Sequence, residues 1–390
     1  MERLGDKTWG RDYYHDLLPK IVQELDPTRP YWPNSPWPGR EGLGGNHVDH
    51  GDRHTWDLRL DGYTSIVPRF ISEFGHLAPS NYSTLLTALK PDDLKLSSPL
   101  LEHRQRATGG TAHHIDKSIL EHFRPPRDFD EWHYLAQLLQ ARAVKIGLEW
   151  ARVNQPRCMG ALVWQLNECW PGMSWSLIDS EGHEKPAASA FRHAAMPRQL
   201  MIYPQGGELP LFACNDTDIQ WAGELTLRRV RFDGEAMRAA TLHVNVAPRT
   251  SQQVTAAAKA VGEPQDPTRE FLVADFGVTR ATHFYLRDRE LRYPRPQLEL
   301  DRKASGRVSL RFTAKTLMRD VVLNATRFQS TRPRWAHTLG PITLLPGEVF
   351  VDRAELSGDG DSQPGTLEHA DEITRPPILW CANWFGADQA

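Results

Sequence analysis

The chain has little cysteine and no long apolar run. Its four cysteines are widely spaced among 390 residues, and none forms a Cys-x-x-Cys pair. This spacing argues against a zinc site or a disulfide scaffold and indicates reduced thiols, which fits a cytoplasmic protein. No apolar run approaches the roughly 18–20 residues needed to span a bilayer, and the polar first residues contain no secretory signal. We therefore expect no membrane partner.

A strong excess of charge is missing as well. The net charge is −3 and the isoelectric point is near 6.6, so the sequence gives no reason to expect nucleic acid as a partner. Hydrophobic residues make up 40% and charged residues 24% of the chain, as in a globular protein. Its length predicts two or three domains. The 13 tryptophans suit either sugar-binding faces or a core, and we expect most of them in the core.

The first part of the chain, residues 1–197, mixes helical and strand patterns. Apolar spacing predicts helices over 12–25 and 131–153 and strands over 66–74 and 161–166. The alternation of helix and strand indicates an α/β architecture with a parallel sheet. Four strands are expected in this part, near positions 31, 55, 70 and 162.

The pattern changes after Pro197 to short, partly alternating segments. Asp233-Gly234 is a turn signal between two of them. This pattern predicts an all-β region of two small sandwiches, over residues 198–292 and 293–360. Residues 361–390 are polar and rich in proline and glycine, and we expect a poorly ordered tail there.

Three sequence runs carry a family resemblance. They are Arg69-Phe70-Ile71-Ser72-Glu73-Phe74-Gly75, the run from Gly160 to Ser176, and Gly51-Asp52-Arg53-His54-Thr55-Trp56. Together they resemble glycoside hydrolase family 2, most closely the β-mannosidases, over residues 1 to about 200 and more loosely beyond. The resemblance implies a multidomain α/β plus all-β protein. Its expected fold is the C-terminal half of a (β/α)8 TIM barrel followed by two immunoglobulin-like β-sandwiches.

The resemblance also implies roles for four residues. Glu73, at a strand end, is the expected nucleophile, because barrel enzymes keep their chemistry at the C-terminal ends of the strands. Trp164 is expected to stack against the sugar, or else to close the barrel core. His54 and Trp56 are candidates for sugar contact, with loop scaffolding as the alternative. No cofactor is expected, because two carboxylates carry out glycoside hydrolysis.

The second carboxylate is the missing part of this assignment. In the family it follows an asparagine on an earlier strand, and Asn167-Glu168 is the one Asn-Glu pair in the chain. This pair comes after Glu73, so we reject it as the acid/base. A complete barrel takes about 250 residues, and the first part of the chain holds about half of one. We therefore expect the acid/base residue and the missing N-terminal half before Met1.

A histidine- and aspartate-rich loop, residues 47–57, also invites a metal interpretation. It meets no zinc spacing, so no metal site is expected. The leading hypothesis is a truncated retaining enzyme that acts on terminal β-mannosides or manno-oligosaccharides. Alternatives are another family 2 exo-glycosidase, such as an exo-β-glucosaminidase or β-galactosidase, a non-catalytic carbohydrate-binding fragment, and one half of a two-chain enzyme.

Overall fold

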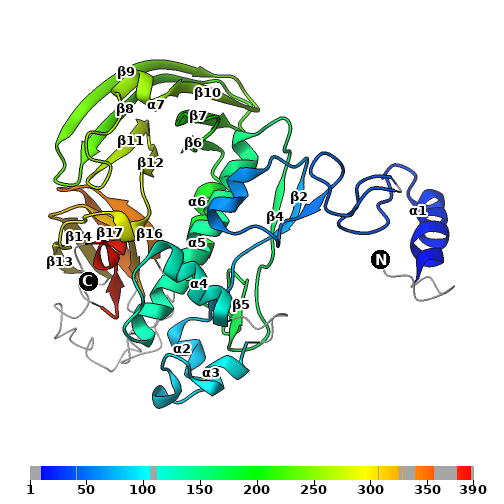
Figure 1. Ribbon diagram of the computed structural model, residues 1–390, viewed down its shortest axis with the longest axis horizontal. Helices are drawn as coiled ribbons and strands as arrows, with labels where there is room; N and C mark the ends of the chain where they lie inside the picture. Colours follow the sequence, from blue (N-terminus) through cyan, green and yellow to red (C-terminus); the bar gives the residue numbers. More distant parts are fainter. Residues whose placement is uncertain are drawn as a thin grey trace.

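The computed structural model describes residues 10–40, 42–105, 112–305, 307–324, 327, 339–354 and 376–387. Figure 1 shows a central helical region, with β-sheets on one side and the helix α1 projecting on the other. None of the helices within these described ranges has the length and apolar character needed to cross a membrane.

The projecting segment consists of the π-helix η1 (Tyr13–Leu17) and α1 (Leu18–Leu25), which confirms the helix predicted over 12–25. Neither element buries a residue. Its apolar side chains are exposed instead, among them Tyr13 at 64% and Leu25 at 77%. A helix this amphipathic normally buries its apolar stripe against another element, and here that stripe faces outward.

A small parallel sheet lies between the helical region and the projecting α1 (Figure 1). Its strands are β1 (Arg53–His54), β2 (Ile71–Phe74) and β4 (Ala161–Val163), in the order β1-β2-β4. The prediction of parallel strands is confirmed, but β2 and β4 are shorter than the ranges 66–74 and 161–166 that were expected. The strand expected near residue 31 is wrong, since that stretch is irregular. Prolines on both sides of it remove hydrogen-bond donors that a sheet needs.

One face of this sheet packs on the long helix α5 (Phe129–Val153), which confirms the helix predicted over 131–153. Asp128 caps the helix by accepting a hydrogen bond from the main-chain N–H of Glu131 at 2.9 Å. Phe74 is fully buried, and a Cβ built on Gly147 of α5 would lie 2.3 Å from its ring. Glycine at this position therefore allows the helix to approach the strand.

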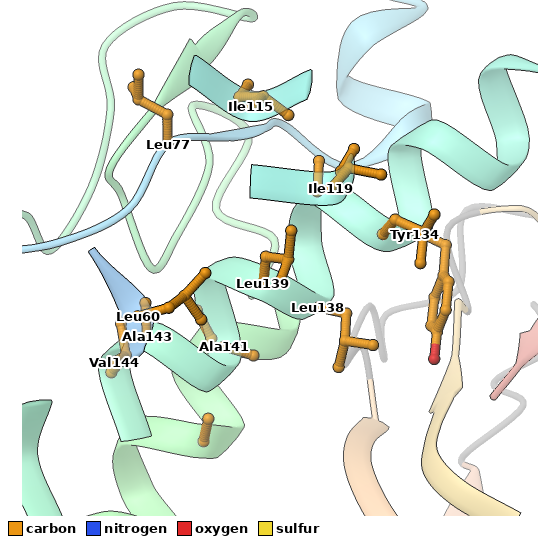
Figure 2. Packing of buried hydrophobic residues seen from close by; sticks show 14 of the residues in the cluster. Leu60, Leu77, Ile115, Ile119, Tyr134, Leu138, Leu139, Ala141, Ala143 and Val144 are labelled. Carbon is orange, nitrogen blue, oxygen red and sulfur yellow. The ribbon is translucent and has the colours of Figure 1, made fainter. Parts of the chain in front are cut away.

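Further helices complete the core around α5. Figure 2 shows Leu138 and Leu139 of α5 among buried side chains that include Ile115 and Ile119 of α4. The remaining elements of this region are η2 (Leu60–Ser65), β3 (Ala78–Pro79), α2 (Tyr82–Leu85), η3 (Pro91–Asp93), α3 (Pro99–His103), α4 (Ala112–His122), β5 (Met173–Ser174) and α6 (Pro186–Ala194).

Two antiparallel sheets follow and pack face to face. Their strand orders are β10-β7-β6 and β12-β11-β8-β9, and both sheets contribute to one apolar cluster. Asp233-Gly234 forms the turn between β8 and β9, with Gly234 at a φ of +93°, so that predicted turn is confirmed. The elements are β6 (Arg198–Ile202), β7 (Pro210–Asn215), β8 (Trp221–Arg231), β9 (Ala236–Val246), β10 (Thr250–Ala256), α7 (Ala257–Val261), β11 (Glu270–Phe276), β12 (Thr279–Phe284) and η4 (Asp288–Glu290).

A second pair of sheets has the orders β13-β14-β17 and β16-β15-β18. Its strands are β13 (Leu298–Ser305), β14 (Arg307–Ala314), β15 (Met318–Leu323), β16 (Leu339–Leu344), β17 (Val349–Ala354) and β18 (Leu379–Trp380), followed by η6 (Ala382–Phe385). The expected tail is wrong for residues 376–387, because β18 pairs with β15 and Phe385 is fully buried. Apolar side chains of residues 376–387 are buried although the preceding residues in the sequence are polar. The rest of the predicted tail lies outside the described residues.

Candidate active site

Glu73 is the third residue of β2 and lies between two parallel neighbours. In the register of the sheet it pairs with His54 of β1. The main-chain N–H of Thr55 donates to the carbonyl of Glu73 at 2.9 Å, and that of Trp164 donates to the carbonyl of Phe74 at 2.8 Å. The sheet therefore brings together at one end all four residues that the sequence singled out.

Two side chains hold one oxygen of the Glu73 carboxylate. The indole Nε1–H of Trp56 donates to Oε2 at 2.9 Å, and Nδ1 of His54 lies 3.3 Å from the same atom. Among the described residues, no hydrogen bond reaches the other oxygen, Oε1. The Glu73 side chain is 26% exposed. His54 and Trp56 thus contact the carboxylate itself, and their expected contact with sugar stays a prediction.

Glu73 opens onto a pocket of about 380 Å³. Three tryptophans line it, Trp56, Trp164 and Trp175, and the rings of Trp56 and Trp175 are 5.6 Å apart at 58°. Within the described part of the chain, Glu73 is the only carboxylate in the pocket lining. Flat indole faces around a single carboxylate suit a ligand with apolar C–H faces and a reactive polar centre.

Two basic side chains and a buried histidine also line the pocket. Arg59 Nη2 lies 2.5 Å from Nδ1 of His114, and both line the pocket with His76. Burial lowers the pKa of His76 to about 4, and the nearby charge of Arg59 adds to the effect. His76 is therefore neutral at physiological pH. None of these three residues had been singled out in the sequence, nor had Trp175 as a pocket residue.

A buried carboxylate, Asp52, lies behind His54. Trp32 Nε1–H and the main-chain N–H of Trp37 donate to its Oδ1, each at 2.9 Å. The hydroxyls of Ser35 and Ser72 donate to its Oδ2. Burial raises the pKa of Asp52, but these hydrogen bonds outweigh it and hold the pKa below its usual range.

The Asp52 cluster continues towards the site, because Ser35 Oγ lies 3.0 Å from Nε2 of His54. Asp52 stands in the same Gly-Asp-x-His-x-Trp run as His54 and Trp56, which is a signal that could have found it. Ser35 has no such signal, since it comes from an irregular, proline-rich stretch.

Glu168, the residue rejected as the acid/base, is buried within the segment between Trp164 and Trp175. It accepts hydrogen bonds from Ser80, Ser174 and Ser176, and Lys185 Nζ lies 3.6 Å from its Oε2. It does not line the pocket. Its hydrogen bonds fix the position of this segment.

The loop of residues 47–57 also has structural partners. Arg53 pairs with Asp57, and Asp49 pairs with Arg157. In the part of the chain that the structure describes, no three His, Cys, Asp or Glu side chains are grouped as they would be to hold a metal ion.

Comparison with known proteins gives two kinds of relative, although no family model matches the chain. The chain is 32% identical over 198 residues to β-mannosidase B of Aspergillus flavus, which covers 48% of this chain and 23% of that protein. It is also 32% identical over 203 residues to β-mannosidase B of Emericella nidulans, with coverages of 50% and 24%. The chain thus spans a minor part of the length of these relatives.

Among solved structures, the β-D-mannosidase from Dictyoglomus thermophilum matches with a TM-score of 0.81 and 26% identity. The match covers 98% of this chain and 46% of that enzyme. The exo-chitosanase of Amycolatopsis orientalis matches with a TM-score of 0.54 and 16% identity over 72% of this chain and 39% of that one, which shows a shared fold. The predicted resemblance to β-mannosidases is confirmed, and the chain is a glycoside hydrolase-like protein.

Proposed function

We propose that the chain supplies the nucleophile side of a retaining β-mannosidase site, in which Glu73 attacks the anomeric carbon of a terminal β-D-mannoside. The observation that carries the proposal is the setting of Glu73. It lies at the end of a parallel strand, with Oε2 accepting a hydrogen bond from Trp56 and lying 3.3 Å from Nδ1 of His54, beside a pocket walled by tryptophans. Likeness to β-mannosidases in sequence and fold supports the substrate class.

In this proposal the two oxygens of the Glu73 carboxylate have different roles. Oε2 receives the N–H of Trp56 and faces His54, so Oε1 is the atom that attacks. The new bond between Oε1 and the anomeric carbon forms as the glycosidic bond breaks and gives a covalent glycosyl-enzyme, which water then hydrolyses. Trp164 and Trp175 offer flat faces on which the sugar ring packs, which orients the anomeric carbon towards Glu73.

Retention requires a second carboxyl group about 5–5.5 Å from the first. We assign it to further barrel strands, on the same or another polypeptide, that would cover the open face of the β1-β2-β4 sheet. That face exposes Leu162 at 55%, whereas the inside of a complete barrel is filled with packed side chains. In this scheme the three parallel strands belong to one half of a TIM barrel, and the two sheet pairs are immunoglobulin-like domains.

The scheme predicts little turnover by the 390-residue chain alone. A general acid/base contributes about 10²–10⁴-fold, and an incomplete site loses substrate positioning as well. The nucleophile can still be tested, because an activated leaving group needs no general acid.

The test is intact mass after incubation with a 2-deoxy-2-fluoro-β-mannosyl donor that carries such a leaving group. We expect a covalent adduct that maps to Glu73 and is absent in Glu73→Gln. An adduct on another residue, or labelling that persists in Glu73→Gln, would contradict the assignment. No adduct on folded protein would contradict assembly of the nucleophile site in this chain.

The sugar specificity needs a separate measurement, because the exo-chitosanase shares the fold. A panel of equally activated 2-fluoro-mannosyl, -glucosyl and -galactosyl donors compares labelling rates on the same protein. Faster labelling by the mannosyl donor supports the proposal. Faster labelling by another donor would contradict the mannoside substrate class but would still support Glu73 as the nucleophile.

A further inference from the structure

His76 is a buried histidine in the wall of the Glu73 pocket, and its ring nitrogens have no hydrogen-bond partner among the described residues. It is 8% exposed and lines the pocket together with Glu73, Trp56 and Trp164. Its Nε2 is sealed from solvent without a partner, and no hydrogen bond to its Nδ1 is formed within the described part of the chain. Buried polar side-chain groups are nearly always hydrogen-bonded, so this imidazole needs an explanation.

A second buried histidine shows what a structural role looks like in this protein. His133 of α5 is 1% exposed, and its Nε2 lies 2.9 Å from the carbonyl oxygen of Ser80. Burial lowers the pKa of both imidazoles, to about 3 in His133 and about 4 in His76, so both are neutral at physiological pH. Only His133 of the two is held by an acceptor in the described protein. His76 keeps its hydrogen-bonding capacity for a group that enters the pocket.

The two nitrogens of His76 differ in what can reach them. A neutral imidazole has one N–H donor and one acceptor nitrogen. Nε2 is sealed, and a buried N–H without an acceptor is the less favourable arrangement, so the proton lies on Nδ1. Nδ1 is not among the sealed atoms. It is therefore the nitrogen that a ligand can reach, and it offers a donor.

The position of His76 in the chain limits which ligand it meets. It follows Glu73 by three residues, which span at most about 11 Å, and both side chains line one pocket of about 380 Å³. A ligand that fills this pocket beside Glu73 and the indole faces therefore contacts the wall that His76 forms. A neutral N–H donor suits a neutral acceptor such as a hydroxyl oxygen, which sugars carry on several carbons.

We infer that His76 is a substrate-binding residue, whose Nδ1–H donates to a hydroxyl oxygen of the sugar that occupies the Glu73 pocket. The inference rests on the proposed function, in which this sugar is a terminal β-D-mannosyl group. Flat indole faces set the plane of a sugar ring but not its rotation within that plane. The hydrogen bond to His76 fixes the rotation and so helps to orient the anomeric carbon towards Oε1 of Glu73.

The charges around His76 are consistent with this role. Burial first, and then the positive charges of Arg59 and His122, hold the pKa of His76 at about 4. The imidazole therefore carries no charge that would pair with Glu73. Glu73 stays available for attack while His76 binds a neutral hydroxyl.

The first test removes the hydrogen bond from each side in turn. His76→Phe keeps a buried ring and removes both nitrogens, whereas the 3-deoxy, 4-deoxy and 6-deoxy forms of the 2-fluoro-mannosyl donor each remove one hydroxyl. The labelling rate is measured for every pair of protein and donor. The intrinsic reactivity of each donor cancels, because the same donor is used with both proteins. We expect a coupling of about ten-fold for one deoxy donor and of about one for the other two. A coupling near one for all three would overturn the inference.

His76→Asn is the matched control. Its amide nitrogen is bonded to Cγ, as Nδ1 is, so it can present an N–H at the same place. This variant should retain the coupling that His76→Phe abolishes. Loss of the coupling in both variants would contradict a donor at the position of Nδ1.

Stability separates a binding residue from a structural one. His76→Phe removes no hydrogen bond that the described protein makes, so its urea midpoint should be equal to or above that of the unaltered chain. His133→Phe removes the bond to Ser80 and should lower the midpoint. A loss in His76→Phe as large as that in His133→Phe would show that His76 has a structural partner and would overturn the inference.

Binding without chemistry separates this inference from the role of Glu73. β-1,4-Mannobiose is titrated calorimetrically into Glu73→Gln, with and without His76→Phe, and the second change should weaken the Kd about ten-fold. An unlabelled unaltered chain whose mannobiose binding depends on His76 would contradict the nucleophile and support the inference. Normal labelling with an unchanged Kd would do the reverse. Absence of both labelling and binding would overturn both.

Discussion

The parallel sheet and the antiparallel sheets of this molecule differ in how far their two faces are buried. In the first antiparallel pair, β8 and β11 place Leu225 and Leu272 in a shared core, each fully buried. In the parallel sheet, one face packs on α5 through Phe74, whereas the other exposes Leu162 and Trp164 at 55% and 44%. The antiparallel pair is closed on itself. The open face of the parallel sheet carries the Glu73 carboxylate and borders the pocket lined by tryptophans.

The two regions are tied by a buried charge network. Arg142 of α5 bonds Asp288 of η4 at 2.6 Å and Asp320 of β15 at 2.5 Å, and Arg319 reaches Asp288 at 3.1 Å. Burial raises the pKa of Asp288, but the two arginines hold it well below its usual range. The helix under the site is thereby fixed to both antiparallel regions.

The largest effect is expected when this connection is broken. Arg142→Met leaves Asp288 buried with one cation fewer, which typically costs about 3–5 kcal/mol of unfolding free energy. Urea unfolding followed by tryptophan fluorescence measures it. The matched control is Arg249→Met, since Arg249 pairs with Asp218 at the surface, where ion pairs contribute little. Equal midpoints for the two variants would show that the network does not stabilise the junction.

The next effect compares one leucine from each region. Leu225→Ala empties space in the closed core and should lower the unfolding free energy by about 2–5 kcal/mol. Leu162→Ala, on the open face, should change it by less than about 0.5 kcal/mol. The same urea experiment checks both, and a large loss in Leu162→Ala would mean that the open face is covered in solution.

A smaller, pH-dependent effect is expected at the start of α5. Burial raises the pKa of Glu131, but hydrogen bonds from Arg124 and Arg127 outweigh it and lower the pKa to about 2. An unfolded glutamate has a pKa of about 4.3. The unfolded chain therefore binds this proton first, and the contribution to stability is present above about pH 4 and is lost as the pH falls towards 2.

Glu131→Gln should accordingly lower the unfolding midpoint near neutral pH, and the difference from the unaltered chain should shrink as the pH falls through that window. Glu224→Gln, on an exposed part of β8, serves as the control. A difference that stays constant down to the lowest pH would exclude Glu131 as the titrating group.

The smallest effect on stability, with a clear effect on chemistry, is expected from Trp56→Phe. Trp56 is 39% exposed, and the change removes the N–H donor to Oε2 while it keeps a flat ring. Labelling by the 2-fluoro-mannosyl donor should slow about ten-fold, with an unfolding free energy within about 0.5 kcal/mol of the unaltered chain. Trp164→Phe, whose indole does not bond Glu73, should slow labelling less; the reverse order would argue against the hydrogen bond.

Much of the fold could be read from periodicity. The helices over 12–25 and 131–153 and the strand that ends near Glu73 follow from apolar spacing. The strands β9 and β13 were not predicted; in β13, four of the eight residues are charged, which hides the strand pattern. Residues 376–387 were assigned to a tail, since two short apolar groups carry no period. Their burial depends on a groove that distant strands create.

The candidate site shows the same division. Glu73, His54, Trp56 and Trp164 were singled out in the sequence because the runs that hold them resemble those of β-mannosidases. Which atom each one contacts was not predictable. Ser35 and Asp52 are 17 positions apart in the sequence. They form a hydrogen bond only because the irregular segment that holds Ser35 packs against β1.

The sequence alone therefore determined the α/β to all-β division, the long helix and the strand that carries a lone carboxylate, because these depend on local spacing and on turn residues. Tertiary structure alone decided that His54 lies against the carboxylate of Glu73 and that Ser35 lies between Asp52 and His54. It also decided that Glu168 is a buried anchor. These are contacts between segments far apart in the chain, and their geometry depends on how the parallel sheet, its loops and α5 pack together.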